Sequence, residues 1–179
     1  MENDQNTVEP ADFSNHRLIY VPHPALETGV KPYQTEDEQY SRELFDYMYK
    51  TMEHHKGVGL AANQINLDAA VFVMRLTGRP AFIINPTVEE MSPKKVLMTE
   101  GCLSDPAMYL KIKRSERIVA SWQTIEGERV RHQLSGMDAR VFLHEFDHLQ
   151  GIMFTDRVSK LKLEMGRKKQ GKRLQKFLA

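Results

Sequence analysis

The sequence has one cysteine and no long hydrophobic segment, and each shortage excludes a class of protein. A single cysteine among 179 residues excludes an intramolecular disulfide, and a lone thiol is typical of a reducing compartment, so we expect a cytoplasmic protein. No run of about 18 apolar residues occurs, so we expect neither a membrane-spanning helix nor a membrane partner. Because 25 basic residues balance 24 acidic ones, the net charge of +1 argues against a general polyanion binder, and we expect no DNA partner.

Each end of the sequence is poor in charge of one sign. Residues 1–16 contain four acidic residues and no Lys or Arg, so we expect neither a signal peptide nor a transit peptide there. Residues 160–179 contain eight Lys or Arg residues and Glu164 as the one acidic residue. No repeat and no Gly/Ser linker divides the sequence, whose length suits one domain. We therefore predict a loose acidic segment at 1–15 and a single domain at 16–179.

Apolar spacing predicts three helices. Thr35 and Glu38 have the spacing of a capping box, and the apolar pattern that follows predicts a helix from about 36 to 55. Two more helices are predicted at 137–149 and 160–178, although two glycines weaken the last one.

Two hairpins are predicted between the first and second helices. Residues 70–74 pair with 81–84 around a Gly-containing turn, and 117–126 pair with 128–134 around Gly127. A helix, several short strands and two further helices, in that order, indicate an α+β fold.

The strongest chemical signal is His144-Glu145-Phe146-Asp147-His148. Residues i and i+4 share one face of a helix, so both imidazoles can bind one metal ion, and Glu145 is then placed to act on a water molecule as an acid or base. The surrounding residues are apolar, and burying four ionisable groups together is costly unless they are paired or bind an ion. The alternatives are an incidental match on a surface helix and a hydrogen-bonded core network. We expect Asp147 to be a structural partner rather than a ligand.

Two histidines need a third ligand. Metalloendopeptidases that share this motif take it from a later His or Glu, but of these types the sequence after His148 contains Glu164 alone. Upstream, Cys102 lies between Gly101 and a polar turn at 104–106, which is typical of an active-site loop rather than of a core. A thiolate with two imidazoles suits Zn, Ni, Co or Fe.

A third feature is Gly57-Val58-Gly59-Leu60-Ala61-Ala62-Asn63-Gln64. Two glycines around one β-branched residue allow a ligand to approach the backbone closely. Taken alone, the segment is equally consistent with a tight structural turn.

The three motifs together resemble the peptide deformylase family, whose members carry segments like GVGLAANQ, EGCLS and HExDHLxG in this order. The resemblance covers residues 16–178. It implies short antiparallel or mixed β-sheets packed around a central metal-binding helix, with one helix near each end. It also implies that Cys102, His144 and His148 bind one divalent metal ion, and it favours Fe(II).

The resemblance also implies an activity and the residues that perform it. The activity is removal of the N-formyl group from the N-terminal methionine of nascent polypeptides, with release of formate. Glu145 is implied as the general acid/base, and Gln64 and the backbone N–H of Leu103 as donors to the oxyanion. Gly59 is implied as part of a strand that faces the substrate.

The residues around these motifs predict a peptide-binding site. Val58 and Leu60 flank Gly59, and Val141 lies one turn before His144, so we expect an apolar pocket for the methionine side chain. An extended substrate can pair with the Gly57–Leu60 edge through main-chain hydrogen bonds. Glu100 of the second motif is also assigned to the substrate site.

The sequence departs from the family pattern at two places. Leu143 stands where Gln is common, and residues 105–110 contain no Arg where many members carry one facing the substrate. The second departure leaves the anchoring of the peptide open. Two alternatives also stay open: a zinc metalloendopeptidase that uses the same helix motif, and a catalytically inactive peptide-binding homologue.

The basic segment 160–179 predicts a helix with a thin apolar stripe at Leu161, Met165, Leu174 and Leu178. Charge alone favours a solvated helix. Family members are thought to dock on the ribosome through a C-terminal helix, so the resemblance implies that this segment binds ribosomal RNA and contributes little to the chemistry.

Overall fold

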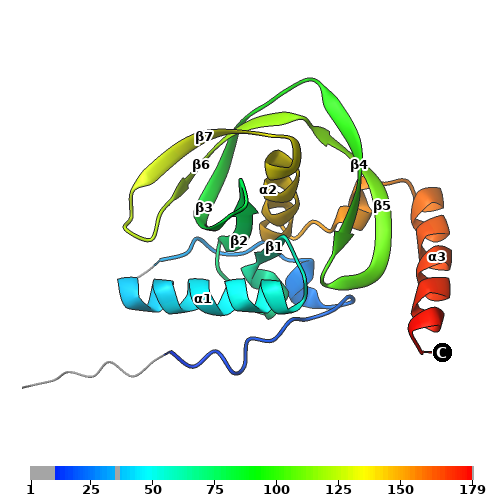
Figure 1. Ribbon diagram of the computed structural model, residues 1–179, viewed down its shortest axis with the longest axis horizontal. Helices are drawn as coiled ribbons and strands as arrows, with labels where there is room; N and C mark the ends of the chain where they lie inside the picture. The colour runs from blue at the N-terminus through cyan, green and yellow to red at the C-terminus, as the bar shows by residue number, and fades with distance from the viewer. Residues whose placement is uncertain (1–10, 35–36, 179) are drawn as a thin grey trace, which may run out of the picture.

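The computed structural model describes residues 11–34 and 37–178, whose strands surround one central helix (Figure 1). The helices are α1 (Glu38–His54), α2 (Gly136–Leu149) and α3 (Lys160–Leu178), with short 3-10 turns η1 (Pro24–Leu26), η2 (Ala62–Ile65) and η3 (Phe154–Arg157). The strands are β1 (Gly59–Ala61), β2 (Val71–Leu76), β3 (Arg79–Met91), β4 (Lys95–Cys102), β5 (Asp105–Ser115), β6 (Arg117–Gln123) and β7 (Arg129–Ser135). The α+β class and the three helices are as the sequence predicts.

α1 begins two residues later than predicted. Asp37 is its N-cap, and the Asp37 side chain accepts a hydrogen bond of 2.8 Å from the backbone N–H of Gln39. The predicted cap, Thr35, lies outside the described residues. Leu44, Met48 and Met52 recur at helical spacing and are fully buried against the larger sheet.

The larger sheet has five antiparallel strands in the order β1-β2-β3-β6-β7. It contains both predicted hairpins, β2 with β3 and β6 with β7. Because β1 is the first strand in this order, one of its edges pairs with β2 and the other does not belong to a ladder of this sheet. A free strand edge of this kind is suited to pair with an extended peptide.

The second sheet is the hairpin of β4 and β5, which the sequence analysis did not predict as strands. Cys102 is the last residue of β4 and pairs with Asp105 across the turn Leu103–Ser104. Where the sequence analysis expected an active-site loop, Cys102 is the last residue of a strand and directly precedes the turn of a hydrogen-bonded hairpin. The ladder holds the thiol in a defined position, which a loop would not do.

α2 lies between the two sheets and contacts strands of both (Figure 1). Its Phe142 packs edge-on against Phe72 of β2, with ring centroids 5.1 Å apart, and also contacts Trp122 of β6. The predicted central position of this helix is confirmed. Both Trp122 and Leu143 are buried in the same core cluster.

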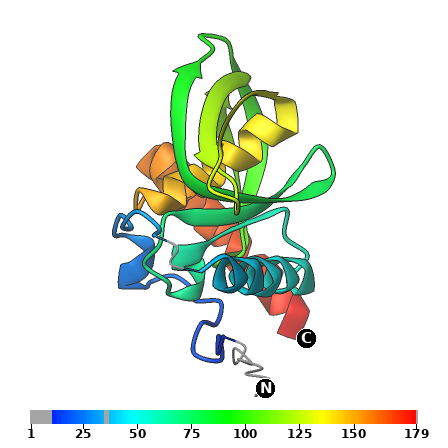
Figure 2. The same cartoon turned by 90° about the vertical axis from the view of Figure 1, so that its left-hand side faces the viewer.

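α3 runs along the outside of β5, at the right of Figure 1 and behind the sheets in Figure 2. Its inner face carries Leu163, Gly166 and Gln170 rather than the predicted stripe. A Cβ on Gly166 would lie 2.7 Å from the Met108 side chain, so a glycine is required for this close approach. The predicted stripe residues Leu161, Met165 and Leu174 are 67%, 52% and 39% exposed, and the side chain of Leu178 lies outside the described part.

Two residues near the end of the segment predicted to be loose contact α1. Phe13 is buried with α1 residues and stacks on Tyr47, and the Ala11 N–H donates to Glu43 Oε2 at 2.6 Å. Residues 1–10 lie outside the described residues. Within the described ranges, none of the helices is long and apolar enough to cross a membrane.

Candidate active site

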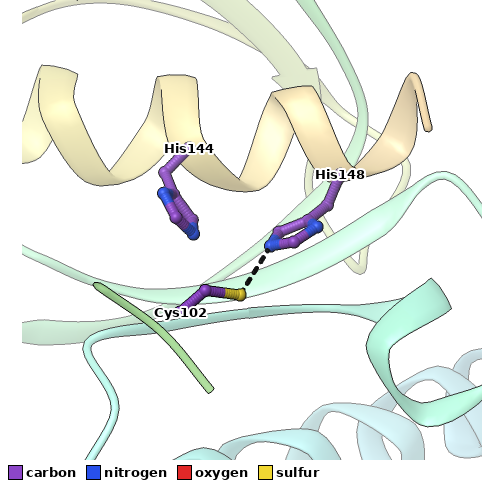
Figure 3. A group of neighbouring side chains, drawn as sticks. All are labelled: Cys102, His144 and His148. Carbon is purple, nitrogen blue, oxygen red and sulfur yellow. Dashed lines mark hydrogen bonds between the residues drawn. The ribbon is translucent and has the colours of Figure 1, made fainter. Parts of the chain in front are cut away.

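α2 supplies two of the three predicted metal ligands. His144 and His148 are buried one helical turn apart, with ring centroids separated by 5.0 Å. Because positions i and i+4 share a helix face, both rings project toward the end of β4 (Figure 3).

The third predicted ligand comes from β4. Cys102 Sγ lies 3.2 Å from His148 Nε2, and one ligand atom from each of the three residues lies within 4.8 Å of the other two (Figure 3). This spacing fits a single ion bound by one thiolate and two imidazoles, with a coordination position left for water or substrate. The structure therefore brings together the three residues that the sequence predicts as ligands.

Glu100 orients the His144 ring through a hydrogen bond at Nδ1. Its Oε2 accepts a hydrogen bond from His144 Nδ1 at 2.9 Å, which leaves Nε2 of that ring for a metal ion. Arg114 binds both carboxylate oxygens of Glu100 at 2.7 and 2.9 Å, and Arg140 binds Oε1 at 2.7 Å. Burial opposes the charge on Glu100, but the hydrogen bonds from His144 and Arg114 hold its pKa well below the usual range. Both oxygens are engaged in this way, so the carboxylate faces His144 rather than offering itself to a peptide.

Asp147 is a structural partner, as expected, but its partners are arginines. Arg114 Nη1 donates to Asp147 Oδ2 at 2.6 Å, and Arg157 donates to both of its oxygens. Arg114 therefore links β5 to the carboxylates of β4 and α2. The sequence analysis singled out none of these arginines.

Glu145 lies next to the ligands with one oxygen unpartnered. It is 4% exposed, and Oε2 is buried and makes no hydrogen bond in the described part of the chain. Burial raises the pKa of Glu145 to about 7. A Cβ on Gly59 would lie 2.7 Å from Glu145 Cδ, so strand β1 passes the carboxylate at a distance that only glycine permits.

The two neighbouring histidines have opposite protonation preferences in the protein alone. Burial opposes charge on His144, but its interactions with Cys102 and Glu100 outweigh this and raise its pKa to about 10. Burial and the charge of His144 lower the pKa of His148. A cation bound by these residues takes the place of the proton on His144, since a metal ligand must be deprotonated.

Gln64 and Leu103 both lie next to Cys102. Gln64 Oε1 accepts from the backbone N–H of Ala61 at 2.8 Å, which directs Nε2 toward Ser104 Oγ at 3.1 Å and Cys102 Sγ at 3.4 Å. Leu103 follows Cys102 directly in the β4–β5 turn. Both residues line the cavity beside the ligands.

A cavity of about 620 Å³ opens beside these residues. Gly57, Val58, Gly59 and Val141 line it, as the sequence predicts. Leu60 does not, because its side chain is fully buried in the core beneath α1. Alternate residues of a strand face opposite sides, so Leu60 can offer the pocket its backbone but not its side chain.

Residues 105–110 contain no arginine, but Arg173 of α3 packs against this segment. Tyr109 lines the cavity, and the Arg173 guanidinium carbon lies 5.1 Å from the centre of its ring. Arg173 also donates to the carbonyl of Ala107 at 3.0 Å. The positive charge of Arg173 therefore lies next to the cavity residues Ala107 and Tyr109, although Arg173 is more than 60 residues further along the sequence.

Taken together, a thiolate, two imidazoles and a buried carboxylate at one cavity form the donor set and the base of a metal-dependent hydrolase. The sequence matches the model of the family described as Polypeptide deformylase over residues 15–164. The chain belongs to the polypeptide deformylase family, and this assignment does not support the metalloendopeptidase alternative.

Individual relatives agree with the family assignment. A peptide deformylase from Thermotoga maritima is 40% identical over 154 residues, which cover 86% of this chain and 93% of the relative. One from Phenylobacterium zucineum is 36% identical over 157 residues, covering 85% and 92%.

Solved structures give the same result. The crystal structure of the Thermotoga maritima peptide deformylase superposes with a TM-score of 0.77 at 40% identity, over 80% of this chain and 97% of that one. A plant peptide deformylase PDF1B gives a TM-score of 0.83 at 29% identity, over 94% of each chain. The enzyme from Synechococcus elongatus, solved in complex with actinonin, gives 0.80 at 31% identity, over 92% and 91%.

Proposed function

We propose that this protein hydrolyses the N-formyl group of peptides that begin with formylmethionine, releasing formate and a free amino terminus. One observation carries the proposal: the unpartnered oxygen of Glu145 lies beside Cys102, His144 and His148 at a cavity edged by β1. The relatives named peptide deformylase support the same reaction.

Cys102, His144 and His148 would hold one divalent metal ion. When bound, such an ion polarises the formyl carbonyl and lowers the pKa of water toward neutrality. The family resemblance favours Fe(II), while the donor set accepts Zn, Ni or Co as well. Glu100 fixes the ring orientation of His144, a contribution that is independent of which ion is bound.

Glu145 acts as the general acid/base. Its free oxygen is in position to accept a proton from the attacking water and then to deliver it to the amine that leaves. The carboxylate is enclosed by α2 and by Gly59, which excludes bulk water from the proton transfer. Gly59 therefore belongs to the reaction site as well as to the substrate edge.

Gln64 and Leu103 stabilise the negative charge that develops on the formyl oxygen. The Gln64 Nε2 amide lies 3.4 Å from Cys102 Sγ and Leu103 follows Cys102 in the chain, which supports these two N–H groups as the donors, and one such donor is worth about 3–4 kcal/mol. The peptide lies along the edge of β1, and Val58 and Val141 provide apolar contacts for the methionine side chain.

The partners follow from the substrate. Formylated amino termini emerge from the ribosome, so we place the protein there, in the cytoplasm, where Cys102 stays reduced. A rice relative that is 36% identical over 80% of this chain is named chloroplastic. The outward face of α3 carries Lys162, Lys168, Lys169 and Lys172, all exposed, and supplies the charge for contact with RNA.

The test is formate release from formyl-Met-Ala-Ser by the metal-loaded full chain. We expect turnover with this peptide and none with an N-acetylated or internally cleavable peptide of the same length. Cleavage of an internal bond would establish an endopeptidase. Peptide binding without formate release would establish an inactive homologue.

A further inference from the structure

The cavity beside the metal ligands has one open direction along β1. Beyond Gly59, the strand continues into Leu60 and Ala61 and then into η2, all fully or almost fully buried. Before Gly59, Val58 is 53% exposed and leads back through Gly57 to the end of α1. A peptide whose formyl end lies at Glu145 must therefore leave past Val58 and Gly57.

A second cavity, of about 490 Å³, lies where such a peptide would leave. Its lining residues come from the segment before η1 and from the last two turns of α1: Arg17, Leu18, Tyr20, Tyr47, Lys50, Thr51, His54 and His55. Tyr20 and His55 also line the cavity beside the metal ligands, so the two hollows adjoin.

The path through the two cavities is positively charged. Arg17 and Lys50 line the second cavity, and Lys56 lines the first one next to it. Within residues 11–34 and 37–178, none of these three side chains forms an ion pair. Among the described residues, no Asp or Glu lines the second cavity. The carboxylates that line the first, Glu100 and Glu145, are buried at its far end.

Lys56 precedes Gly59 by three residues, so an extended peptide of six residues is long enough to pass it. Each residue of a strand advances about 3.3 Å, so three residues span about 10 Å. A peptide that has its first residue beside Gly59 and runs past Gly57 brings its fourth residue toward Lys56 and the next residues toward the second cavity, which adjoins the first at Tyr20 and His55.

We propose that Lys56 and the second cavity form a subsite for acidic side chains at positions four to six of the formylated peptide. The proposal rests on the proposed deformylase function and adds a charge preference to it. Tyr20 and Tyr47 supply flat apolar surface beside the cations, which allows the peptide backbone to lie against the protein while its carboxylates face Arg17 and Lys50.

The experiment compares formyl-Met-Ala-Ser-Glu-Glu-Ala, formyl-Met-Ala-Ser-Gln-Gln-Ala and formyl-Met-Ala-Ser-Lys-Lys-Ala as substrates of the metal-loaded full chain. At low salt we expect kcat/KM to be about tenfold higher for the Glu peptide than for the Lys peptide, mostly through KM, with the Gln peptide between them. At about 0.5 M salt the difference should shrink, because exposed charges are screened. Equal kcat/KM values, or a preference for the Lys peptide, would overturn the proposal.

Two variants and a matched control locate the preference. Lys50→Glu and Lys56→Glu should each lower the Glu/Lys ratio by about threefold, and together should remove or invert it. Lys113→Glu makes the same charge change on an exposed residue of β5 that lines neither cavity, and should leave the ratio unchanged. An equal effect of all three variants would show a response to net charge rather than a subsite.

Binding of the products separates this proposal from the proposed function. Calorimetry with Met-Ala-Ser-Glu-Glu-Ala and Met-Ala-Ser-Lys-Lys-Ala should show the same preference without turnover. A protein that prefers the acidic product but releases no formate would refute the deformylase function and retain the subsite. A protein that deformylates all peptides equally and shows no preference in binding would support the deformylase function and refute the subsite.

Discussion

Glu145 is the residue whose role is most directly testable. Glu145→Gln keeps the shape of the side chain but removes its ability to exchange a proton, so we expect the metal content and fold to be retained while kcat falls by a factor of about 10²–10⁴. Metal analysis and formate release measure the two effects, with Glu164→Gln on the exposed side of α3 as a control. Loss of the metal ion in Glu145→Gln would instead identify Glu145 as a ligand.

Gly59 provides an independent test of the same carboxylate. In Gly59→Ala the new methyl group would overlap Glu145, with its Cβ 2.7 Å from Cδ, so the acid/base must move. We expect a folded protein in which kcat falls at least tenfold, because small displacements of a reacting group are costly. Gly171→Ala, where a Cβ meets nothing within 4 Å, should leave kcat unchanged and stabilise α3 slightly. Normal turnover by Gly59→Ala would contradict the placement of Glu145.

At the scale of elements, Arg114 connects the small sheet to α2 through its ion pairs with Glu100 and Asp147. Arg114→Leu would leave Glu100 and Asp147 buried without their main counter-charge, and we expect a loss of about 3–5 kcal/mol in the free energy of unfolding. Urea denaturation measures it. Arg131→Leu breaks ion pairs with Glu89 and Glu90 at a site that is 59% exposed, and should cost less than about 1 kcal/mol. Equal costs for the two variants would show that burial does not decide the outcome.

How far the elements were predictable depends on where their partners lie. The β2–β3 and β6–β7 hairpins and α2 were predictable because their signals are local: a turn between two apolar runs, or an apolar pattern along one helix. β4 and β5 were missed, although Met108, Leu110, Ile112 and Arg114 alternate and all face inward. The pattern was not recognised because two of the buried positions of β5 hold charged residues, Asp105 and Arg114, where an apolar residue is expected.

In the candidate site, too, the residues with local sequence signals were predictable and those with distant partners were not. The grouping of Cys102, His144 and His148 was predictable because each lies in a short motif, and the motifs occur together. The role of Glu100 was not predictable, because its partners Arg114 and Arg140 are 14 and 40 residues away. The inner face of α3 was assigned to the wrong residues, because it is formed by a glycine and by Gln170, whose amide donates to distant Asp105 at 2.7 Å.

At the scale of the whole molecule, α3 has one face packed on β5 and one exposed face that is rich in lysine. Its inner face covers β5, so deletion of the helix would expose Met108 and Leu110 and would not test ribosome binding alone. Replacing the exposed residues Lys162, Lys168, Lys169 and Lys172 by Ser keeps the inner face. We expect co-sedimentation with ribosomes at low salt to fall sharply while activity on formyl-Met-Ala-Ser is retained. Unchanged co-sedimentation would show that the helix is only a cover for β5.

The metal ion determines how the whole enzyme withstands air. If Fe(II) is the native ion, activity of the iron form should decay in air, because Fe(II) and the Cys102 thiolate are both oxidisable. The nickel or cobalt form should keep its activity over the same period. Activity followed over hours, in air and under nitrogen, measures the difference. Full and air-stable activity of a zinc-loaded protein without iron would contradict the preference for Fe(II).

The ion pairs around the ligands have a consequence for when the enzyme becomes active. Glu100, Arg114, Arg140 and Asp147 bind one another within the chain and hold His144 in place through protein contacts alone. Folding and acquisition of the cation are therefore separate events, unlike in a zinc finger, where the ion is needed for folding. Chains made while the metal ion is scarce would remain folded, and a later supply of the ion would activate them without new protein synthesis.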